Sequence, residues 1–122
     1  MESFTKLTAW KEGLSLVKQI YKLTKEFPPD ERFGLTSQLR RASTSITANL
    51  AEGFSRVTPA DKKYRYIICR SECTETQAHL LVSLELSLGK PEEIHRAIEQ
   101  CHIVGKLLSG LIYSQERKTY IP

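Results

Sequence analysis

The stretch LTSQLRRASTSITANLAEGFSR, residues 35–56, decides the fold. Its apolar residues recur every three or four positions, which places them on one face of a helix. These residues are Leu39, Ala42, Ile46 and Leu50. A threonine precedes the pattern and a glycine closes it, and both are typical of helix boundaries. We therefore predict a helix over residues 36–54, with Thr36 as its N-cap.

Proline and glycine mark off three further helices. Phe27-Pro28-Pro29 ends the first, because proline lacks an amide hydrogen and disfavours helix in the residue before it. Thr58-Pro59-Ala60-Asp61 starts the third with a capping threonine, a proline at the first helical position and an acid at the third. Gly89-Lys90-Pro91 ends that helix and starts the fourth. The predicted helices span residues 7–26, 36–54, 59–88 and 91–114.

The connections predict how these helices pack. Because helices joined by a short connection pack antiparallel, we expect helices that are neighbours in sequence to be antiparallel. We predict an all-α fold, an antiparallel up-down-up-down four-helix bundle formed by residues 1–122 as one domain. The tail from Gln115 to Pro122 is polar, and we expect it to be loosely held.

Composition indicates a soluble intracellular protein. The chain has 122 residues, of which 40% are hydrophobic and 26% charged, as is ordinary for a globular domain. Its three cysteines form no paired spacing, and the N-terminus does not resemble a secretion signal. No apolar run approaches the roughly 20 residues that cross a bilayer. We expect a cytoplasmic location and no membrane association.

Positive charge gathers in one part of the chain. The net charge is +4, divided as +1 over residues 1–39, +5 over residues 40–70 and −2 over residues 71–122. An anionic partner is therefore sought first on the middle stretch. A charge excess of this size is also common on solvated surfaces, so the count alone does not decide between the two.

Basic and aromatic residues alternate in this stretch as they do in nucleic-acid-binding proteins. Arginine and lysine neutralise phosphates, and exposed tyrosines stack on unpaired bases. The candidate side chains for RNA or DNA binding are Arg40, Arg41, Arg56, Lys62, Lys63, Arg65 and Arg70, with Tyr64 and Tyr66 between them.

A structural role competes for the same cations. In an antiparallel pair of helices turning near residue 57, Glu52 lies near Lys62, Lys63 or Arg56, and these could form ion pairs. Arg40 and Arg41 would then meet Glu72 or Glu75 and be unavailable to phosphate. The sequence leaves both alternatives open.

On the third predicted helix, four side chains lie on the side opposite the apolar face that we expect to pack into the core. At about 100° per residue, this outer set consists of Glu75, His79, Val82 and Leu86. Two aliphatic residues one turn apart on an outer face suggest a contact between subunits. The alternative is two isolated exposed apolar residues, which surfaces tolerate.

Signs of catalysis, a metal or a cofactor are lacking. The chain has no phosphate-binding glycine loop, nucleophile elbow or paired Glu-x-x-His motif. The soft ligands that a metal would need are Cys69, Cys73, His79, Cys101 and His102. Their spacing along the two helices does not bring four together, and no Cys-x-x-Cys pair exists. We expect no enzymatic activity, no metal and no cofactor.

The second predicted helix also carries a family likeness. It closely resembles the signature of the four-helix-bundle 23S rRNA-intervening sequence proteins, and the first helix and its loop resemble the same family. The residues that carry the likeness are Gln38-Leu39-Arg40-Arg41-Ala42, Ser45-Ile46, Asn49-Leu50-Ala51-Glu52-Gly53, Trp10, Tyr21, Thr24, Phe27-Pro28 and Glu31. The third helix departs from the family pattern, with Ser71-Glu72 in place of Gly-Ser and Ser87-Leu88-Gly89 in place of Gly-Tyr.

The resemblance implies a setting that spacing alone does not. Such proteins are often encoded within bacterial large-subunit rRNA genes, so a role linked to RNA has been presumed. The family is similar to the pentameric accessory protein of diversity-generating retroelements, which assists a reverse transcriptase. A homopentamer is the assembly that this likeness implies.

Two functions follow as hypotheses. The first is a non-enzymatic oligomer that binds nucleic acid, structured RNA before DNA, through the end where the second and third helices meet. The second is a protein-interaction scaffold that docks a partner such as a reverse transcriptase or a ribosome-associated protein. Salt separates the two, because it weakens phosphate binding strongly and apolar docking little.

Overall fold

The protein is a bundle of four α-helices, as the sequence predicts. The computed structural model describes residues 3–119, and this part of the chain contains no strand. The helices are α1 (Thr8–Thr24), α2 (Leu35–Ser55), α3 (Pro59–Glu85) and α4 (Pro91–Thr119), with two short 3-10 helices, η1 (Phe4–Lys6) and η2 (Pro29–Glu31). None of these helices is long and apolar enough to span a membrane.

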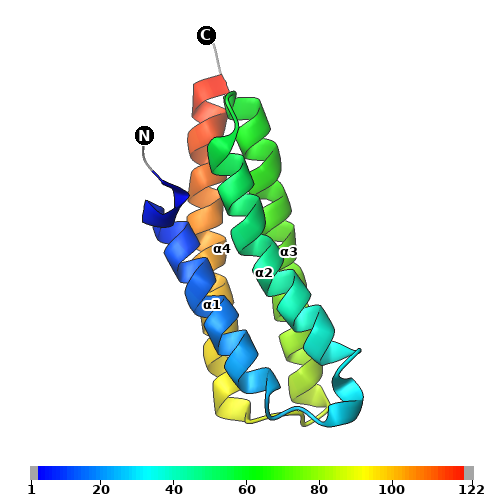
Figure 1. Cartoon of the computed structure of the whole chain (residues 1–122). Helices are drawn as coiled ribbons and strands as arrows, with labels where there is room; N and C mark the ends of the chain where they lie inside the picture. The colour runs from blue at the N-terminus through cyan, green and yellow to red at the C-terminus, as the bar shows by residue number, and fades with distance from the viewer. Residues whose placement is uncertain (1–2, 120–122) are drawn as a thin grey trace.

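Consecutive helices run antiparallel around a ring. α2 lies between α1 and α3, and α4 closes the ring between α3 and α1 (Figure 1). The α2–α3 turn and the C-terminal part of α4 lie together at the upper end, where α2, α3 and α4 extend beyond the start of α1 (Figure 1). Four residues of the predicted basic patch, Arg56, Lys62, Lys63 and Arg65, lie at or beside this turn.

The core is a continuous apolar cluster to which all four helices contribute side chains. Full burial of an aliphatic side chain contributes about 1.5–3 kcal/mol, so this cluster holds the ring together. Its fully buried members include Leu16 and Ile20 from α1, Leu39, Ile46 and Leu50 from α2, Leu80 from α3, and Ile94 and Leu108 from α4.

Near the upper end, α2 and α3 approach one another at Gly53. A Cβ atom at this position would lie 2.8 Å from the Tyr66 ring and 3.0 Å from the Cβ of Arg65. Tyr66 is only 2% exposed and belongs to the core. The prediction that Tyr66 stacks on bases is therefore wrong, because the close approach at Gly53 buries the ring.

The helix starts follow the predicted chemistry at α3 but not at α2. Thr58 caps α3, with its hydroxyl oxygen accepting a hydrogen bond from the Asp61 amide at 3.1 Å. Thr36 is not the N-cap of α2, because the helix begins one residue earlier, with Gly34 in that position. There the carboxylate of Glu31 accepts from the Leu35 amide at 3.1 Å and does the work of a cap.

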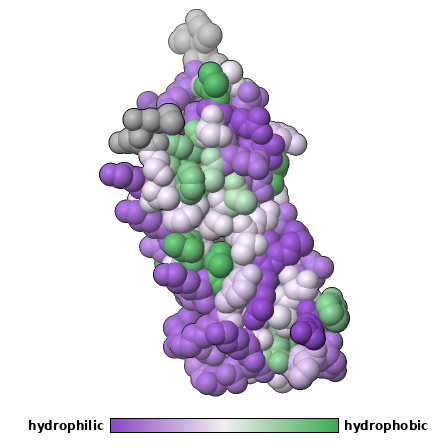
Figure 2. Space-filling model, in the orientation of Figure 1, coloured by the Kyte–Doolittle hydropathy of each residue, from purple (hydrophilic) through white to green (hydrophobic). Residues whose placement is uncertain are grey.

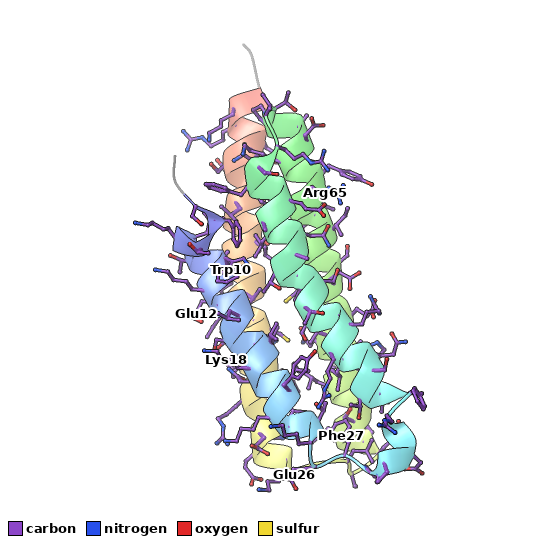
Figure 3. All side chains as sticks on the ribbon, in the orientation of Figure 1. Trp10, Glu12, Lys18, Glu26, Phe27 and Arg65 are labelled. Atoms are coloured by element: carbon purple, nitrogen blue, oxygen red, sulfur yellow. The ribbon has the colours of Figure 1, made fainter. Side chains whose placement is uncertain are left out.

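At the lower end, the chain leaves α3 sooner than predicted. The helix stops at Glu85 instead of residue 88, because Ser87 and Gly89 adopt positive φ angles of 58° and 69°. A Cβ at Gly89 would lie 2.8 Å from the ring of Phe27, which sits at this end (Figure 3). The α3–α4 turn is thus fitted against the end of α1.

α4 continues well past the predicted residue 114. It remains helical through Thr119, so most of the expected loose tail is helix, and only residues 120–122 lie outside the described part. Arg117 and Lys118 stand in its last turn, where positive charge interacts favourably with the helix dipole. The extension carries these two cations to the upper end.

Candidate nucleic-acid interface

The central cation of the upper end, Arg65, is held in place by α2. Its Nη1 lies 3.0 Å from the carboxylate of Glu52 and donates a hydrogen bond to the Asn49 side-chain oxygen at 3.2 Å. We predicted that Glu52 pairs with Lys62, Lys63 or Arg56, and this is wrong. On α3, it is Arg65 and not Lys62 or Lys63 that faces Glu52 on α2. Figure 3 shows Arg65 near the upper end of α3.

The two lysines before Arg65 face different neighbours. Lys62 donates from Nζ to the Phe54 carbonyl at 2.6 Å and lies 5.3 Å from the centre of the Phe54 ring. It thereby satisfies a carbonyl that the end of α2 leaves open. Lys63 points instead toward α4 and lies 3.5 Å from the carboxylate of Glu116. Both lysines carry structural contacts while keeping their charge at the upper end.

Arg56 differs from these three cations. Its backbone amide closes the last turn of α2, but no carboxylate among residues 3–119 lies within ion-pair distance of its exposed guanidinium. With Asp61, Tyr64 and Arg65 it lines a hollow of about 220 Å³ beside the α2–α3 turn. This group combines two cations, one acid and one aromatic ring.

α4 adds positive charge that sequence reasoning missed. Burial lowers the pKa of the Lys62 ammonium, and the nearby positive charge of Lys118 lowers it further. Two like charges from different helices therefore share the upper end. Arg117 and Lys118 were set aside as part of a tail, although basic residues in succession are a known signal for the last turn of a helix.

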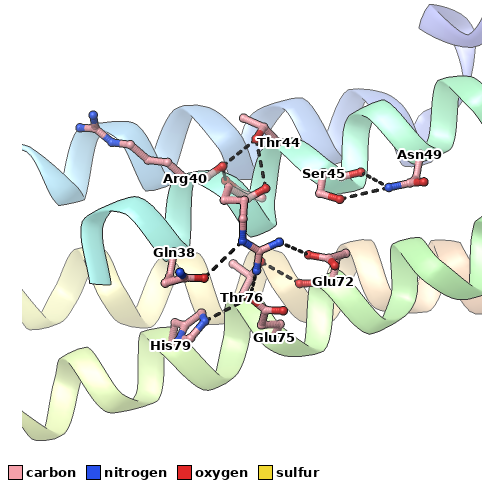
Figure 4. A network of polar contacts seen from close by, with 11 residues as sticks. Gln38, Arg40, Thr44, Ser45, Asn49, Glu72, Glu75, Thr76 and His79 are labelled. Carbon is pink, nitrogen blue, oxygen red and sulfur yellow. Dashed lines mark hydrogen bonds and ion pairs between the residues drawn. The ribbon is translucent and has the colours of Figure 1, made fainter. Parts of the chain in front are cut away.

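Arg41 belongs to a network in the middle of the bundle. It lies 3.3 Å from the Glu72 carboxylate, donates a hydrogen bond to Glu75, and donates from its Nε to the Gln38 side-chain oxygen at 3.2 Å (Figure 4). His79 contacts the same Glu75 oxygen at 3.2 Å. Burial alone would lower the pKa of Arg41, but Glu75 and Glu72 raise it above its usual value. The predicted pairing of Arg41 with Glu72 and Glu75 is confirmed.

Arg40 takes a different course from its neighbour. Its side chain points away from Glu72 and Glu75 and toward α1 (Figure 4). There its Nε donates to the Thr24 hydroxyl at 3.0 Å, and its guanidinium lies 4.4 Å from the centre of the Tyr21 ring. The predicted pairing of Arg40 with Glu72 or Glu75 is wrong, because one helical step of 100° turns it to the other side of α2.

Arg70 is the last of the predicted nucleic-acid contacts. Its guanidinium lies 3.5 Å from the Ser109 hydroxyl of α4, at the long limit for a hydrogen bond. The side chain is exposed and lies further down α3 than the residues around the turn. The structure thus divides the predicted patch into the upper end, the Arg41 network and two arginines held by α1 and α4.

The four predicted subunit contacts on α3 fall into two pairs. Glu75 and His79 contact one another and belong to the Arg41 network, so both already have partners within the chain. Val82 and Leu86 are 46% and 58% exposed, and the neighbouring Leu81 is exposed as well. On the face formed by α1 and α2, by contrast, hydrophobic surface occurs in separate spots among hydrophilic residues (Figure 2).

The cysteines are buried free thiols. Cys69 Sγ donates to the Ile46 carbonyl at 3.5 Å, and Cys73 Sγ donates to the Cys101 carbonyl at 3.3 Å. Burial raises the pKa of Cys69 to about 12. Within residues 3–119, no three His, Cys, Asp or Glu side chains lie together in a way that could hold a metal ion.

A larger hollow lies away from all of these residues, between α1 and α4. It has a volume of about 520 Å³ and a wide mouth, and it is lined by Gln19, His95, Arg96, Glu99 and Gln100. Gln100 is held at its edge, donating to the Glu12 carbonyl at 2.9 Å and to the Glu12 carboxylate at 2.7 Å. Its lining mixes amide, acidic and basic groups, which gives no preference for one kind of ligand.

Comparison with known proteins agrees with the fold. The sequence pattern of the 23S rRNA-intervening sequence proteins matches residues 5–110. A crystal structure from Bacteroides thetaiotaomicron, of a protein with unknown function from the S23 ribosomal protein family, superposes with a TM-score of 0.79 at 24% identity. The match covers 86% of this chain and 98% of that one. No curated protein matches the chain by sequence.

Proposed function

Because the chain belongs to the 23S rRNA-intervening sequence protein family, we propose that it is a non-enzymatic protein that binds nucleic acid, structured RNA before DNA, through its upper end. The binding surface in this proposal is formed by the α2–α3 turn together with the last turn of α4. Its cations are Arg56, Lys62, Lys63, Arg65, Arg117 and Lys118.

The observation that carries the proposal is crowding of positive charge without enough acid to balance it. Lys62 and Lys118 come from different helices, yet the charge of one lowers the pKa of the other. Arg56, at the α2–α3 turn, has no carboxylate partner among residues 3–119. A phosphate backbone would relieve this repulsion and release its own counterions on binding.

The ion pairs of Lys63 and Arg65 leave these two cations accessible to a phosphate. Lys63 and Glu116 are both substantially exposed, and exposed ion pairs contribute about 0–1 kcal/mol, so a phosphate competes for such a lysine at little loss. Arg65 is positioned by Glu52 and Asn49 and loses less side-chain entropy on binding than an unrestrained arginine.

The family suggests which nucleic acid is bound, and the cysteines suggest in which compartment the binding takes place. The family takes its name from sequences that interrupt 23S rRNA, which makes structured RNA the first ligand to try. We place the activity in the cytoplasm, and the three unpaired thiols support a reducing compartment. The role needs binding and positioning by these side chains and no bond making.

The test is binding of a fluorescent structured RNA and a matched duplex DNA over a salt series. The variant Arg56→Glu/Lys118→Glu reverses two cations, one from each side of the surface, for which no carboxylate partner lies in the described part of the chain. We expect the parent protein to bind with an affinity that falls steeply with salt, and the variant to lose at least tenfold at low salt.

The matched control reverses the same amount of charge at the lower end. Lys25→Glu/Lys90→Glu changes two exposed lysines near the α1–α2 and α3–α4 connections. Equal losses in both variants would mean that only net charge matters, and the upper end would no longer be a site. Absence of binding by the parent at low salt would overturn the proposal itself.

A second candidate function rests on the lower part of α3. Leu81, Val82 and Leu86 leave aliphatic surface exposed within six residues, which is typical of a contact between proteins. We propose self-association through this surface, with the homopentamer implied by family resemblance as the first assembly to test. Docking of a protein partner is the alternative use.

Light scattering on Val82→Glu/Leu86→Glu tests this surface. Charge at two interface positions costs desolvation energy, so the variant should form smaller species than the parent. Leu86 and Val82 are exposed, so helix content should stay the same. An unchanged mass, in a parent that is itself oligomeric, would show that subunits meet elsewhere.

A further inference from the structure

The hollow beside the α2–α3 turn has a composition that a simple phosphate site lacks. Arg56, Asp61, Tyr64 and Arg65 line it. We propose that it seats one unpaired base of a single-stranded nucleic acid, with the base on Tyr64, an amino group of the base at Asp61, and the adjoining phosphate at Arg56. This inference rests on the proposed function and names the form of nucleic acid that the upper end prefers.

Opposite charges face this hollow without neutralising each other. Asp61 and Arg56 both line it, yet they do not form an ion pair, and the Asp61 carboxylate has no side-chain partner among residues 3–119. A carboxylate repels phosphate, and two guanidiniums repel a cation. A nucleotide satisfies both kinds of group, because it presents an anionic phosphate on one side and amino hydrogens on the other.

Tyr64 provides the platform for stacking. The residue is 64% exposed, and the Arg65 guanidinium lies 6.0 Å from its ring centre. Since Arg65 is itself fixed by Glu52 and Asn49, the ring has a positioned neighbour. Bases stack on such rings regardless of sequence, and only an unpaired base offers its face.

The volume also fits one base. Sites that enclose a complete small-molecule ligand measure roughly 300–1,000 Å³. At about 220 Å³, this hollow is smaller and holds one flat ring system with the groups at its edge. The rest of the strand would lie outside it, along the cations of the upper end.

Asp61 predicts which bases are preferred. An ionised carboxylate only accepts hydrogen bonds. Adenine, cytosine and guanine each carry an exocyclic amino group, whereas uracil presents carbonyl oxygens in its place. Strands of adenine or cytosine should therefore bind more tightly than strands of uracil.

The experiment measures anisotropy of short fluorescent RNA strands of oligo(A), oligo(C) and oligo(U), a mixed-sequence strand and the same strand annealed to its complement. A DNA strand of the mixed sequence distinguishes the two sources of unpaired base. We expect the single strand to bind more tightly than its duplex, with oligo(A) and oligo(C) ahead of oligo(U).

Three variants and one control separate stacking from charge. Tyr64→Ala should weaken single-strand binding by on the order of fivefold or more, and Tyr64→Phe should restore it because the ring is kept. The matched control is Phe33→Ala, which removes an exposed ring lying 5.8 Å from Arg32 in the α1–α2 connection, outside the hollow, and should leave affinity unchanged. Asp61→Asn should narrow the gap between oligo(U) and the other strands, because an amide both donates and accepts.

The experiment distinguishes failure of the proposed function from failure of the base site. If the parent binds no nucleic acid at low salt, the proposed function fails and the inference falls with it. If the parent binds but prefers the duplex, or if Tyr64→Ala binds as tightly as Phe33→Ala, the phosphate surface stands and the base site is wrong. If Asp61→Asn raises affinity for all strands equally, Asp61 acts through charge alone and reads no base.

Discussion

Arg41 lies within α2 and Arg56 lies just beyond its end, and the two arginines differ in whether a carboxylate pairs with them. Arg41, in the N-terminal third of α2, faces α3, which brings Glu72 and Glu75 to it. Arg56 lies where α2 has ended and α3 has only begun, and no carboxylate among residues 3–119 reaches it. In a bundle, the position of a cation along the axis decides how many neighbours can balance its charge.

The same rule explains why the upper end stays basic. Among residues 3–119, its acids are Glu52, Asp61 and Glu116, which are fewer than its cations. The helix ends also compete for hydrogen bonds, as when Lys62 donates to the Phe54 carbonyl. Sequence position alone makes residues 40–41 and 56–65 look like one patch, but Arg41 is paired with Glu72 and Glu75, whereas Arg56 has no carboxylate partner among residues 3–119.

The largest expected contrast concerns nucleic-acid affinity. Removing two charges with Arg56→Gln/Lys118→Gln should lower RNA affinity by on the order of tenfold and reduce the salt slope by about two. Arg40→Gln/Arg41→Gln removes the same charge from the N-terminal third of α2 and should change affinity less than twofold. Anisotropy over a salt series measures both, and equal losses would erase the distinction between the two regions.

The next contrast concerns the packing that forms the upper end. Gly53→Ala should lower the free energy of unfolding by about 1–3 kcal/mol, because the added methyl meets the Tyr66 ring and the Arg65 Cβ. Gly110→Ala on α4 is the control, since a Cβ there meets nothing within 4 Å. It should raise stability by about 0.5–1 kcal/mol through helix propensity. Urea unfolding compares the two, and a stabilising Gly53→Ala would show that the helices can move apart.

A smaller contrast concerns the stabilising value of each arginine. Arg41 is 48% exposed at its side chain, so its ion pairs are screened, and Arg41→Gln should cost about 0.5–1 kcal/mol of unfolding free energy. Arg56→Gln should cost almost nothing, since it has no carboxylate partner in the described part of the chain. A double-mutant cycle with Glu75→Gln isolates the pair. A coupling energy of zero would mean that Arg41 is as unrestrained as Arg56.

The smallest expected effect is electrostatic and lies within the upper end. Lys62 should titrate below the usual 10.5, because burial and the Lys118 charge lower its pKa. The unfolded chain then holds this proton more tightly, so the contribution of Lys62 to stability rises as pH rises through the interval between the two pKa values. Lys118→Gln should raise the Lys62 pKa. NMR of the lysine side chains measures this, and an unmoved pKa would mean that the two charges do not interact.

Local signals explain why the fold could be predicted. The Thr58-Pro59-Ala60-Asp61 start is confirmed down to the Thr58 hydroxyl, because capping involves only neighbouring residues. The cap of α2 was missed since it is supplied by Glu31, from the preceding 3-10 turn. The extent of α4 was missed because its polar last turns were taken for a tail, although they face the upper end of the bundle.

The candidate site could be predicted only where a short turn sets the register of two helices, as between α2 and α3. Arg41 finds its acids on α3 through a simple antiparallel register, so its pairing was foreseen. Arg40 meets Tyr21 and Thr24 of α1, and helical phase alone does not say on which side α1 packs. The approach of Lys118 to Lys62 depends on how far α4 runs, which no local pattern around residues 56–65 records.

The unequal helix lengths have a consequence for how the chain opens. α1 is the shortest helix of the ring and joins α2 through the long segment between Thr24 and Leu35. Its release breaks fewer interactions than release of any other helix, so its amides should exchange with solvent deuterium through the lowest-energy opening. The α2–α3–α4 end stays assembled in that state. A partially unfolded molecule would thus keep the surface that we propose for nucleic acid.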